Sequence, residues 1–470
     1  MNSKKNLLLF GLMVILFLGT FSIYYPGFMS EDSFFQFAEA RSGVYDDNNP
    51  PLMAFIWRQV DQIYPGQTGM LALQLILYWG GLYFITLTMD MSLLAGSAFL
   101  ILVGLYPGTL GILGVIWKDI LMMAFMVVAV ACYFQTQKGK KKWPWHIATF
   151  SFLFLACCLR HNGVFALPPL FAWIFVCLLP KSMSRLRKGL LAVILSLGTS
   201  FVFVEGNHFV DRVVLNAKEM NLWALLPLCD LAETYYYLGY IPPGTKMPFQ
   251  TQKFTYENLR AFHSDQSIMG LLLPFCQPGQ ICENPPVIDL NAYPDENDRN
   301  VALKNLRTLW LSEIVKYPIP YLKHRWGIFA ETLGLRPTLW APVYFTVVKS
   351  DLVKDDFNLH HEPTRLQASI RELLQERTSG LFFRMWAALV FNLLVMSWCL
   401  WRFYRGYPQN LAVVALGASA LSYELPYFFI TPGCDYRYSL WFLLATLIFL
   451  FLTLRDFLVL RSLKTSEMEK

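Results

Sequence analysis

Charged residues are scarce in this chain of 470 residues, where Asp, Glu, Lys and Arg together account for 15% of the sequence. The sequence also has no Walker A loop, no GxGxxG after a strand, no HExxH helix and no GxSxG elbow. Because each of these motifs carries a particular chemistry, their absence argues against ATP-driven transport and zinc-dependent hydrolysis. No internal repeat or low-complexity tract occurs, although many transporters are built from repeats.

Hydrophobic residues, in contrast, make up 55% of the chain. They gather into runs of about 17 to 25 residues, the length that crosses a bilayer as a helix. This pattern predicts an all-α polytopic membrane protein with about ten transmembrane helices. The expected spans are 6–25, 68–87, 92–107, 119–134, 145–159, 163–179, 189–205, 381–402, 410–430 and 439–457. The first run also resembles a signal peptide, but no small-residue cleavage site follows it, so we expect a retained helix.

Clusters of Lys and Arg set the expected orientation of these spans. They fall at 135–143, 181–188, 402–410 and in the tail from Arg455, and the positive-inside rule places all of them in the cytoplasm together with both termini. Because the basic residues sit in these short clusters despite a net charge of +6, no nucleic-acid-binding face is expected. We expect a multi-pass protein of the bacterial inner membrane.

This topology predicts three parts. Residues 1–205 form an N-terminal transmembrane bundle, 206–380 a mixed insert that caps it on the periplasmic side, and 381–470 the C-terminal transmembrane helices. The insert contains proline-rich turns and two amphipathic stretches, 303–310 and 364–377. The shorter segments expected on the same outer side are 24–52, 106–119, 160–162 and 431–438.

Cysteine usage fits an oxidising periplasm. Cys276 and Cys282 enclose a Pro-Gly turn, and they either close a small disulfide loop or remain two unpaired thiols. Their spacing is not a zinc pattern, because no clustered His or Cys accompanies it. No metal and no other cofactor is expected.

Acidic residues follow directly after the first apolar run, in the sequence Ser30-Glu31-Asp32. This pattern is typical of a helix start, with Ser30 as N-cap and both acids in the first turn, where the helix dipole favours them. A carboxylate held at a helix start is also well oriented as a general base, so the two interpretations are compatible.

A second acidic pair, Asp46 and Asp47, leads into Pro50-Pro51 and an apolar, aromatic helix. The proline pair fixes an extended entry and an abrupt helix start. We interpret the helix as an interfacial one with Trp57 at the headgroup level. The two acids are expected to be scaffolding or acceptor contacts.

Two more outer turns carry charges. Lys118 and Asp119 begin an apolar run, and adjacent residues on a helix face different directions, so we do not expect them to pair with each other. Arg160 and His161 lie in a very short turn. Basic residues in a short outer loop run against the positive-inside rule, which favours phosphate binding by Arg. Snorkelling of the lysine and ordinary lipid anchoring are the alternatives.

The last outer loop contains Asp435, Tyr436 and Arg437. Asp435 either neutralises Arg437 in an ion pair or contacts substrate. Within the insert, Arg325 adds a cation ahead of an apolar stretch. One side of the membrane therefore carries several separated acids and cations, which suits a lipid-phosphate substrate that reacts at the interface.

These motifs resemble the GT-C glycosyltransferases. Glu31-Asp32 followed by Pro50-Pro51-Leu52 looks like the start of the protein O-mannosyltransferases and of the aminoarabinose transferases that modify lipid A. The later "WKD", "RHNGV" and "DYRY" sequences resemble bacterial relatives that decorate O-antigen or other surface glycans. The acids appear here as Glu-Asp, where the mannosyltransferases present Asp-Glu, so the choice between Asp32 and Glu31 as base stays open.

The resemblance implies a GT-C-like fold and transfer of a hexosyl or pentosyl unit from a polyprenyl-phosphate donor to a periplasmic or cell-surface glycan, lipid or protein acceptor. Asp32 or Glu31 would take the proton of the acceptor hydroxyl, and a single displacement would invert the anomeric carbon. The cations expected on the departing lipid phosphate are Lys118, Arg160, His161, Arg325 and Arg437. The other expected substrate contacts are Asp119, Asp435 and Tyr436. A divalent metal on Asp32 and Asp119 is conceivable but not expected.

Two alternative functions share these features. A transporter or flippase of a lipid-linked glycan also needs cations for phosphate, but transporters often carry charges at mid-membrane, where Glu424 is the exception here. An O-antigen polymerase or ligase shares the membrane architecture and the outer cations, but it usually attacks lipid pyrophosphate donors.

Overall fold

The computed structural model describes residues 2–138, 142–266, 271, 287–289, 292–293, 295–337, 339–347, 362–407 and 410–468. This part of the chain is all helical, with 73% helix and no strand. The predicted helical class is therefore confirmed. Contacts divide the chain into two compact units, the first made of Met1–Glu219, Ala341–Leu425 and Arg437–Lys470, and the second of Met220–Trp340 and Pro426–Tyr436.

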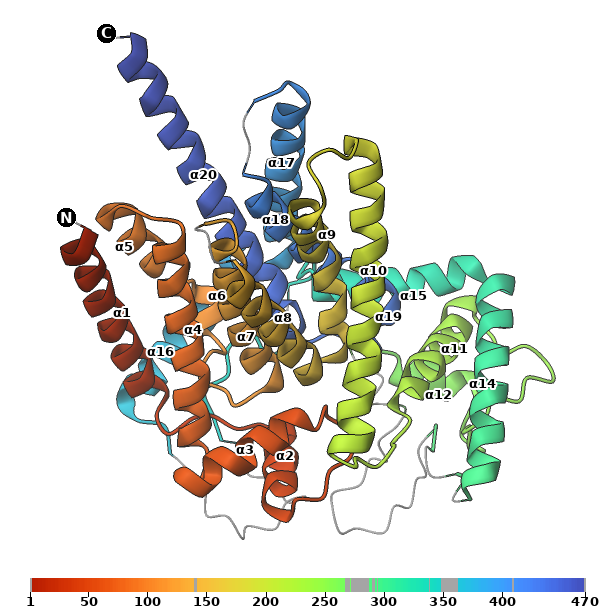
Figure 1. Ribbon diagram of the computed structural model, residues 1–470. Coiled ribbons are helices and arrows are strands. Elements are labelled where there is room, and N and C mark those ends of the chain that lie inside the picture. Colours follow the sequence, from red (N-terminus) through yellow and green to blue (C-terminus); the bar gives the residue numbers. More distant parts are fainter. Residues whose placement is uncertain are drawn as a thin grey trace. The chain divides into compact units, whose positions relative to one another are not determined.

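The helices follow one another along the chain as Figure 1 shows. Their bounds are α1 Asn2–Tyr24, α2 Glu31–Ser42, α3 Leu52–Ile63, α4 Thr68–Thr88, α5 Leu93–Leu102, α6 Pro107–Leu110, α7 Lys118–Gln135, α8 Trp143–Leu159, η1 His161–Ala166, α9 Leu167–Leu178, α10 Arg185–Phe209, η2 Val210–Val214, η3 Leu222–Ala224, α11 Leu225–Leu238, α12 Tyr256–Phe262, α14 Glu296–Lys316, α15 Pro318–Thr332, α16 Arg365–Glu376, η4 Leu381–Phe383, α17 Met385–Tyr404, α18 Leu411–Glu424, α19 Tyr427–Ile430, η5 Tyr436–Ser439 and α20 Leu440–Met468.

Eight helical segments of the described residues are long and apolar enough to cross a membrane. They are Ser3–Tyr24, Thr68–Thr88, Lys118–Gln135, His161–Leu178, Arg185–Val214, Met385–Tyr404, Leu411–Ile430 and Tyr436–Leu460. Two more expected spans correspond to shorter apolar helices, α5 and α8. The membrane class is therefore supported, while the count of ten stays a prediction.

Helix α7 forms the centre of the first unit. It packs against both α4 and α8 (Figure 1), and its side chains from Asp119 to Val127 are all buried. A helix that is apolar around its whole circumference is buried on all sides. Helix α1, in contrast, leaves Leu7, Leu8 and Ile15 exposed, which fits a helix facing lipid.

The segment after α1 is attached to the segment before α7 by backbone hydrogen bonds. Phe28 N donates to Gly114 O at 3.0 Å, and Ile116 N donates to Phe28 O at 2.9 Å. Gly114 is required here because a Cβ at that position would lie 2.4 Å from the ring of Tyr24. Ser33 Oγ then donates to Ile116 O at 2.8 Å, which fixes the first turn of α2 on the same segment.

Helix α3 corrects one expectation from the sequence. Trp57 was expected at the headgroup level, but it is fully buried. Its indole N–H donates to Gly66 O at 3.1 Å, and its ring centroid lies 5.0 Å from that of Phe37 in α2. The expectation was wrong because α3 turns its tryptophan toward α2 and exposes Phe55 and Ile63 instead.

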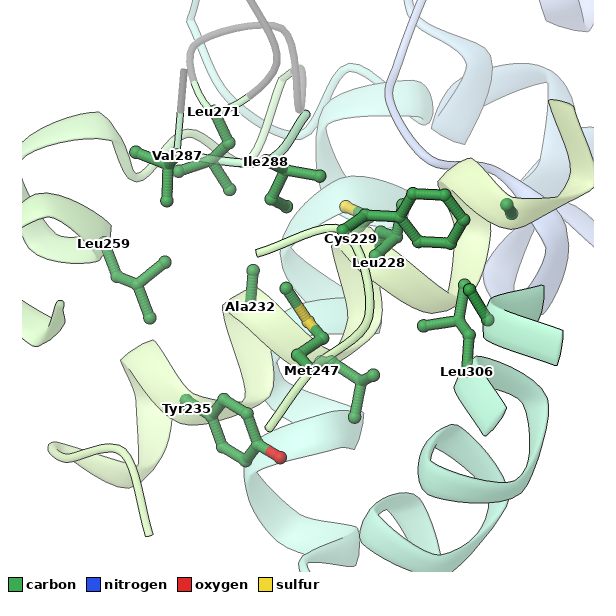
Figure 2. Packing of buried hydrophobic residues seen from close by; sticks show 14 of the residues in the cluster. Leu228, Cys229, Ala232, Tyr235, Met247, Leu259, Leu271, Val287, Ile288 and Leu306 are labelled. Carbon is green, nitrogen blue, oxygen red and sulfur yellow. The ribbon is translucent and has the colours of Figure 1, made fainter. Parts of the chain in front are cut away.

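The second unit is built around α11, which packs against α14 and α15. Figure 2 shows Leu228, Ala232 and Tyr235 of α11 within the hydrophobic cluster of this unit, near Leu306 of α14. The stretch 303–310 lies within α14 and buries Leu303 and Leu306, as its amphipathic pattern predicts. The stretch 364–377 contains α16, which belongs to the first unit. That the second unit caps the membrane bundle stays a prediction.

Candidate functional site

Asp32 and Arg437 form an ion pair in the first unit. Nη2 of Arg437 lies 2.6 Å from Oδ2 of Asp32. Asp32 is in the first turn of α2, and Ser30 is the N-cap of this helix, as the sequence predicts. Arg437 is in η5, the short helix that precedes α20. The Asp32 side chain is 35% exposed and that of Arg437 is 12% exposed. The carboxylate of Asp32 is therefore accessible, while the guanidinium of Arg437 is largely buried.

Asp119 lies between two arginines. Its carboxylate forms an ion pair with Arg160, and its Oδ2 lies 4.0 Å from Nε of Arg437. Asp119 is fully buried, in the first turn of α7, and Arg160 follows α8 directly. Because α7 and α8 pack side by side, the start of one helix meets the end of the other. Arg437 thus connects Asp119 with Asp32.

Lys118 points differently from its neighbour, as expected for adjacent helical residues. Its Nζ donates to Oδ1 of Asn49 at 2.5 Å. Asn49 stands just before the two prolines that precede α3, so this bond ties the start of α7 to the second acidic segment. We use the name charged cluster for Asp32, Lys118, Asp119, Arg160 and Arg437.

Aromatic rings hold the two arginines of the charged cluster. The guanidinium carbon of Arg437 lies 4.6 Å from the ring centroid of Trp117, and that of Arg160 lies 4.3 Å from the ring centroid of Tyr438. Trp117 is in turn fixed by its indole N–H, which donates to Oγ of Ser30 at 2.7 Å. Cation–π contacts of this kind orient guanidinium groups without neutralising their charge.

The pKa of Asp32 lies below its ordinary value. Partial burial opposes ionisation of the carboxyl group, but the charges of Arg437, Lys118 and Arg160 and the hydrogen bond from Arg437 outweigh it. Asp32 is therefore a carboxylate at neutral pH. Glu31, the other candidate base, precedes it in the same turn, but its side chain is exposed.

His161 has a partner outside the charged cluster. Its Nε2 lies 3.1 Å from Oδ2 of Asp211, a buried residue of η2. Its neighbour Arg160 donates from Nε to Oδ1 of Asn162 at 2.8 Å. The two residues of this short turn therefore diverge, and the structure places Arg160, not His161, with Asp119.

The second acidic pair has structural contacts. Oδ1 of Asp46 accepts a hydrogen bond from Asn48 N at 2.9 Å, and Oδ2 of Asp47 lies 2.7 Å from Nη2 of Arg212. The first interaction forms a local turn, and the second holds the segment against the end of α10 and η2. Both contacts agree with the scaffolding interpretation.

Arg325 belongs to the second unit, where it is fully buried in an ion pair with Asp230. It also donates to Thr431 O, and Nε2 of His324 lies 3.3 Å from the same Asp230. A guanidinium enclosed in this way has no exposed face for a phosphate. The structure thus shows Arg325 packing α15 against α11, and its expected contact with the donor stays a prediction.

Asp435 and Tyr436 also fall in the second unit. Both are buried, and Tyr436 N donates to Trp340 O at 3.2 Å. Cys276 and Cys282 lie outside the described residues. Within the described part of the chain, no group of three or more His, Cys, Asp or Glu side chains is placed to hold a metal ion.

Sequence reasoning missed three residues that support the charged cluster: Asn49, Trp117 and Tyr438. Two of them carried a signal, because Trp117 and Tyr438 lie in the quoted motifs "WKD" and "DYRY". Comparison of the chain with protein-family models, with curated proteins and with solved structures found no match.

Proposed function

We propose that this chain is a membrane glycosyltransferase that moves a sugar from a polyprenyl-phosphate donor to a periplasmic or cell-surface acceptor. The observation that carries the proposal is the charged cluster, in which an accessible carboxylate, Asp32, stands beside three cations at the ends of apolar helices. Such a donor presents a phosphate and an anomeric carbon within a few bond lengths of each other, so its enzyme needs a base and cations close together.

In the proposed reaction, the acceptor oxygen attacks the anomeric carbon and Asp32 takes the hydroxyl proton. A new carbon–oxygen bond forms to the acceptor while the bond to the lipid phosphate breaks, and the phosphate leaves with the electron pair. Arg437 and Lys118 stabilise the negative charge that develops on the phosphate. Displacement in one step inverts the configuration of the anomeric carbon.

The charge balance of the cluster supports an anionic substrate. Lys118, Arg160 and Arg437 supply three positive charges, against two negative charges on Asp32 and Asp119. Partly buried positive charge attracts an anion strongly, and each hydrogen bond to a charged group contributes about 1.5 to 3 kcal/mol. A donor phosphate is the anion that the membrane interface offers in this position.

The ion pair with Arg437 bears on the timing of proton transfer. A carboxylate with a lowered pKa is ionised but weakly basic, so Asp32 accepts the proton during the attack rather than before it. A phosphate that draws Arg437 away from Asp32 raises the basicity of the carboxylate when the donor is bound. The base is thus strengthened by the substrate itself.

Two matched substitutions in α2 test the proposal. Asp32→Asn removes the proposed base, and Glu31→Gln removes an exposed acid one residue earlier in the same turn. Each variant is expressed in a strain that lacks the gene, and surface glycans and lipid A are analysed by mass spectrometry. The strain that expresses Asp32→Asn is expected to lack the same sugar as the deletion strain. The strain that expresses Glu31→Gln is expected to carry this sugar, as wild type does.

Size-exclusion chromatography of both variants shows whether they remain folded in detergent. Full activity of folded Asp32→Asn would rule out Asp32 as the base. If Glu31→Gln alone abolished transfer, the base would be Glu31. A deletion strain with unchanged surface glycans, lipid A and surface proteins would overturn the proposed function as a whole.

A second candidate function, transport of a lipid-linked glycan, is favoured by one observation. Glu424 is fully buried in a membrane-spanning segment, where it accepts a hydrogen bond from Oγ of Ser439 at 2.8 Å. Carboxylates at such depth often serve transport. In this case Glu424→Gln, rather than Asp32→Asn, would abolish function, and intact lipid-linked glycan would accumulate in the membrane.

A further inference from the structure

A cavity of about 330 Å³ lies between α17, α18 and α20 of the first unit. Its volume is within the usual range for ligand pockets. The lining is largely apolar and includes Val413 and Val414 of α18 and Phe457 of α20. Arg402, in the last turn of α17, brings a positive charge to this wall.

Arg402 is held by three aromatic rings. Its guanidinium carbon lies 4.8 Å from the ring centroid of Trp398, 5.4 Å from that of Tyr407 and 5.7 Å from that of Phe457. Among the described residues, no carboxylate forms an ion pair with Arg402, and its Nε has no hydrogen-bond partner. A cation at the end of an apolar helix, positioned but not neutralised, is suited to an anionic ligand.

The other charged groups of the cavity are already paired. Nη1 of Arg455 lies 3.3 Å from Oδ1 of Asp456, and Nη2 of Arg455 donates to Met89 O at 2.6 Å. Nδ2 of Asn410 donates to Oδ2 of Asp456 at 3.4 Å. The charges of Arg455 and Asp456 compensate each other, so the net positive charge that faces the cavity comes from Arg402.

The cavity and the charged cluster lie at opposite ends of one membrane helix. Arg437 stands just before α20, whereas the residues of α20 that line the cavity begin at Thr453. Sixteen residues separate the two positions, which corresponds to about 24 Å along a helix. The cavity is therefore remote from the proposed catalytic site, on the side that the Lys and Arg clusters assign to the cytoplasm.

We propose that this cavity binds the headgroup of an anionic membrane phospholipid. The phosphate lies on the guanidinium of Arg402, and the acyl chains follow the apolar side chains of Val414 and Phe457 into the bilayer. Basic pockets between membrane helices on the cytoplasmic side are known to take lipid headgroups in this way. The arrangement commits to a lipid because a hydrophilic anion would gain nothing from the apolar wall.

Native mass spectrometry of the purified full-length protein tests this site. The protein is titrated with dioleoyl phosphatidylglycerol, and the fraction with bound lipid is compared between wild type, Arg402→Gln and Arg405→Gln. Arg405 is the matched control, because it directly follows α17, three residues after Arg402, but is exposed and does not line the cavity. Arg402→Gln is expected to weaken lipid binding about tenfold, since it removes a charge-assisted contact, while Arg405→Gln leaves it nearly unchanged.

A second variant covers the case in which Arg402→Gln fails to fold. Val414→Phe keeps Arg402 and fills the cavity, so it is expected to abolish the tight lipid adduct as well. Dioleoyl phosphatidylcholine, which carries no net charge, should bind much more weakly than phosphatidylglycerol. Equal losses in Arg402→Gln and Arg405→Gln, or tight binding retained by folded Val414→Phe, would overturn the site. Thermal stabilisation by inorganic phosphate but not by phosphatidylglycerol would overturn the lipid as its occupant.

Discussion

Nη2 of Arg437 lies 2.6 Å from Oδ2 of Asp32, although one residue follows the first membrane helix and the other precedes the last. The same guanidinium reaches Asp119 with its Nε at 4.0 Å. One planar side chain therefore spaces the two carboxylates of the charged cluster. Only arginine presents donors in two directions from a rigid fork.

Substitution of Arg437 by lysine is expected to keep the charge but lose this geometry. A lysine ammonium is a point charge and cannot contact Asp32 and Asp119 together. We expect donor use to fall about tenfold or more, with the protein still folded, because charge-assisted hydrogen bonds are lost. The measurement is transfer activity at several donor concentrations. Arg41→Lys, in an exposed pair with Asp61, is the control and should behave as wild type.

Asp119→Asn is expected to act on stability as well as activity. Asp119 is fully buried between two arginines, and removing one partner of a buried pair typically costs about 3 to 5 kcal/mol. The midpoint of thermal unfolding in detergent should fall markedly. Asp90→Asn breaks an exposed pair with Lys5 and should cost at most about 1 kcal/mol. Similar midpoints for the two variants would contradict the buried role of Asp119.

Arg325→Gln is expected to unfold the second unit without a selective effect on donor use. The side chain is fully buried against Asp230, so its loss leaves an uncompensated carboxylate. Limited proteolysis should cut the variant within 220–340 faster than wild type. Lys323→Gln, two residues earlier and exposed, is the control. A stable variant with weakened donor binding would instead support the phosphate role expected from the sequence.

We expect Glu39 to make the stability of the folded protein depend on pH. Burial raises the pKa of its carboxyl group from 4.5 to about 8, although the backbone N–H of Asp46 donates to it. Between these two pH values the folded state holds a proton that the unfolded state has lost, so stability falls as pH rises from 4.5 to 8. Above pH 8 the protonated Glu39 carboxyl group no longer contributes to the stability of the folded state.

Glu39→Gln resembles the protonated acid and should remove this dependence. We expect the thermal midpoint of the variant to match that of wild type near pH 5 and to exceed it near pH 8. The comparison uses the same detergent at both pH values, with Glu31→Gln as an exposed control. A wild-type midpoint that rises relative to that of the variant between pH 5 and pH 8 would contradict the protonated state of Glu39.

The positions of the helices could be predicted well from the sequence, because apolar runs of the right length have few other uses. The expected span 68–87, for example, corresponds to α4 at Thr68–Thr88. The expected span 92–107 was too long, since α5 ends at Leu102 and a turn leads to Pro107, which starts α6. The apolar sequence continues through this turn, although the helix ends before it.

The charged cluster could be predicted only in outline. Separated acids and cations were expected on one side of the membrane, and the structure brings Asp32, Asp119, Arg160 and Arg437 together. Their pairing could not be predicted, because it depends on which helices pack side by side. The same holds for Arg325, which was placed ahead of an apolar stretch but lies within α15, facing Asp230.

The hydrogen bonds of Phe28 to Gly114 and Ile116 have a mechanical consequence. They join the segment that carries Asp32 to the segment that begins α7, so these two parts of the chain form one hydrogen-bonded frame. Lys118 and Asp119 belong to this frame, whereas Arg160 directly follows α8 and Arg437 lies in η5. The spacing of Asp32 and Asp119 is therefore set by this frame, whereas the two arginines reach the carboxylates from outside it.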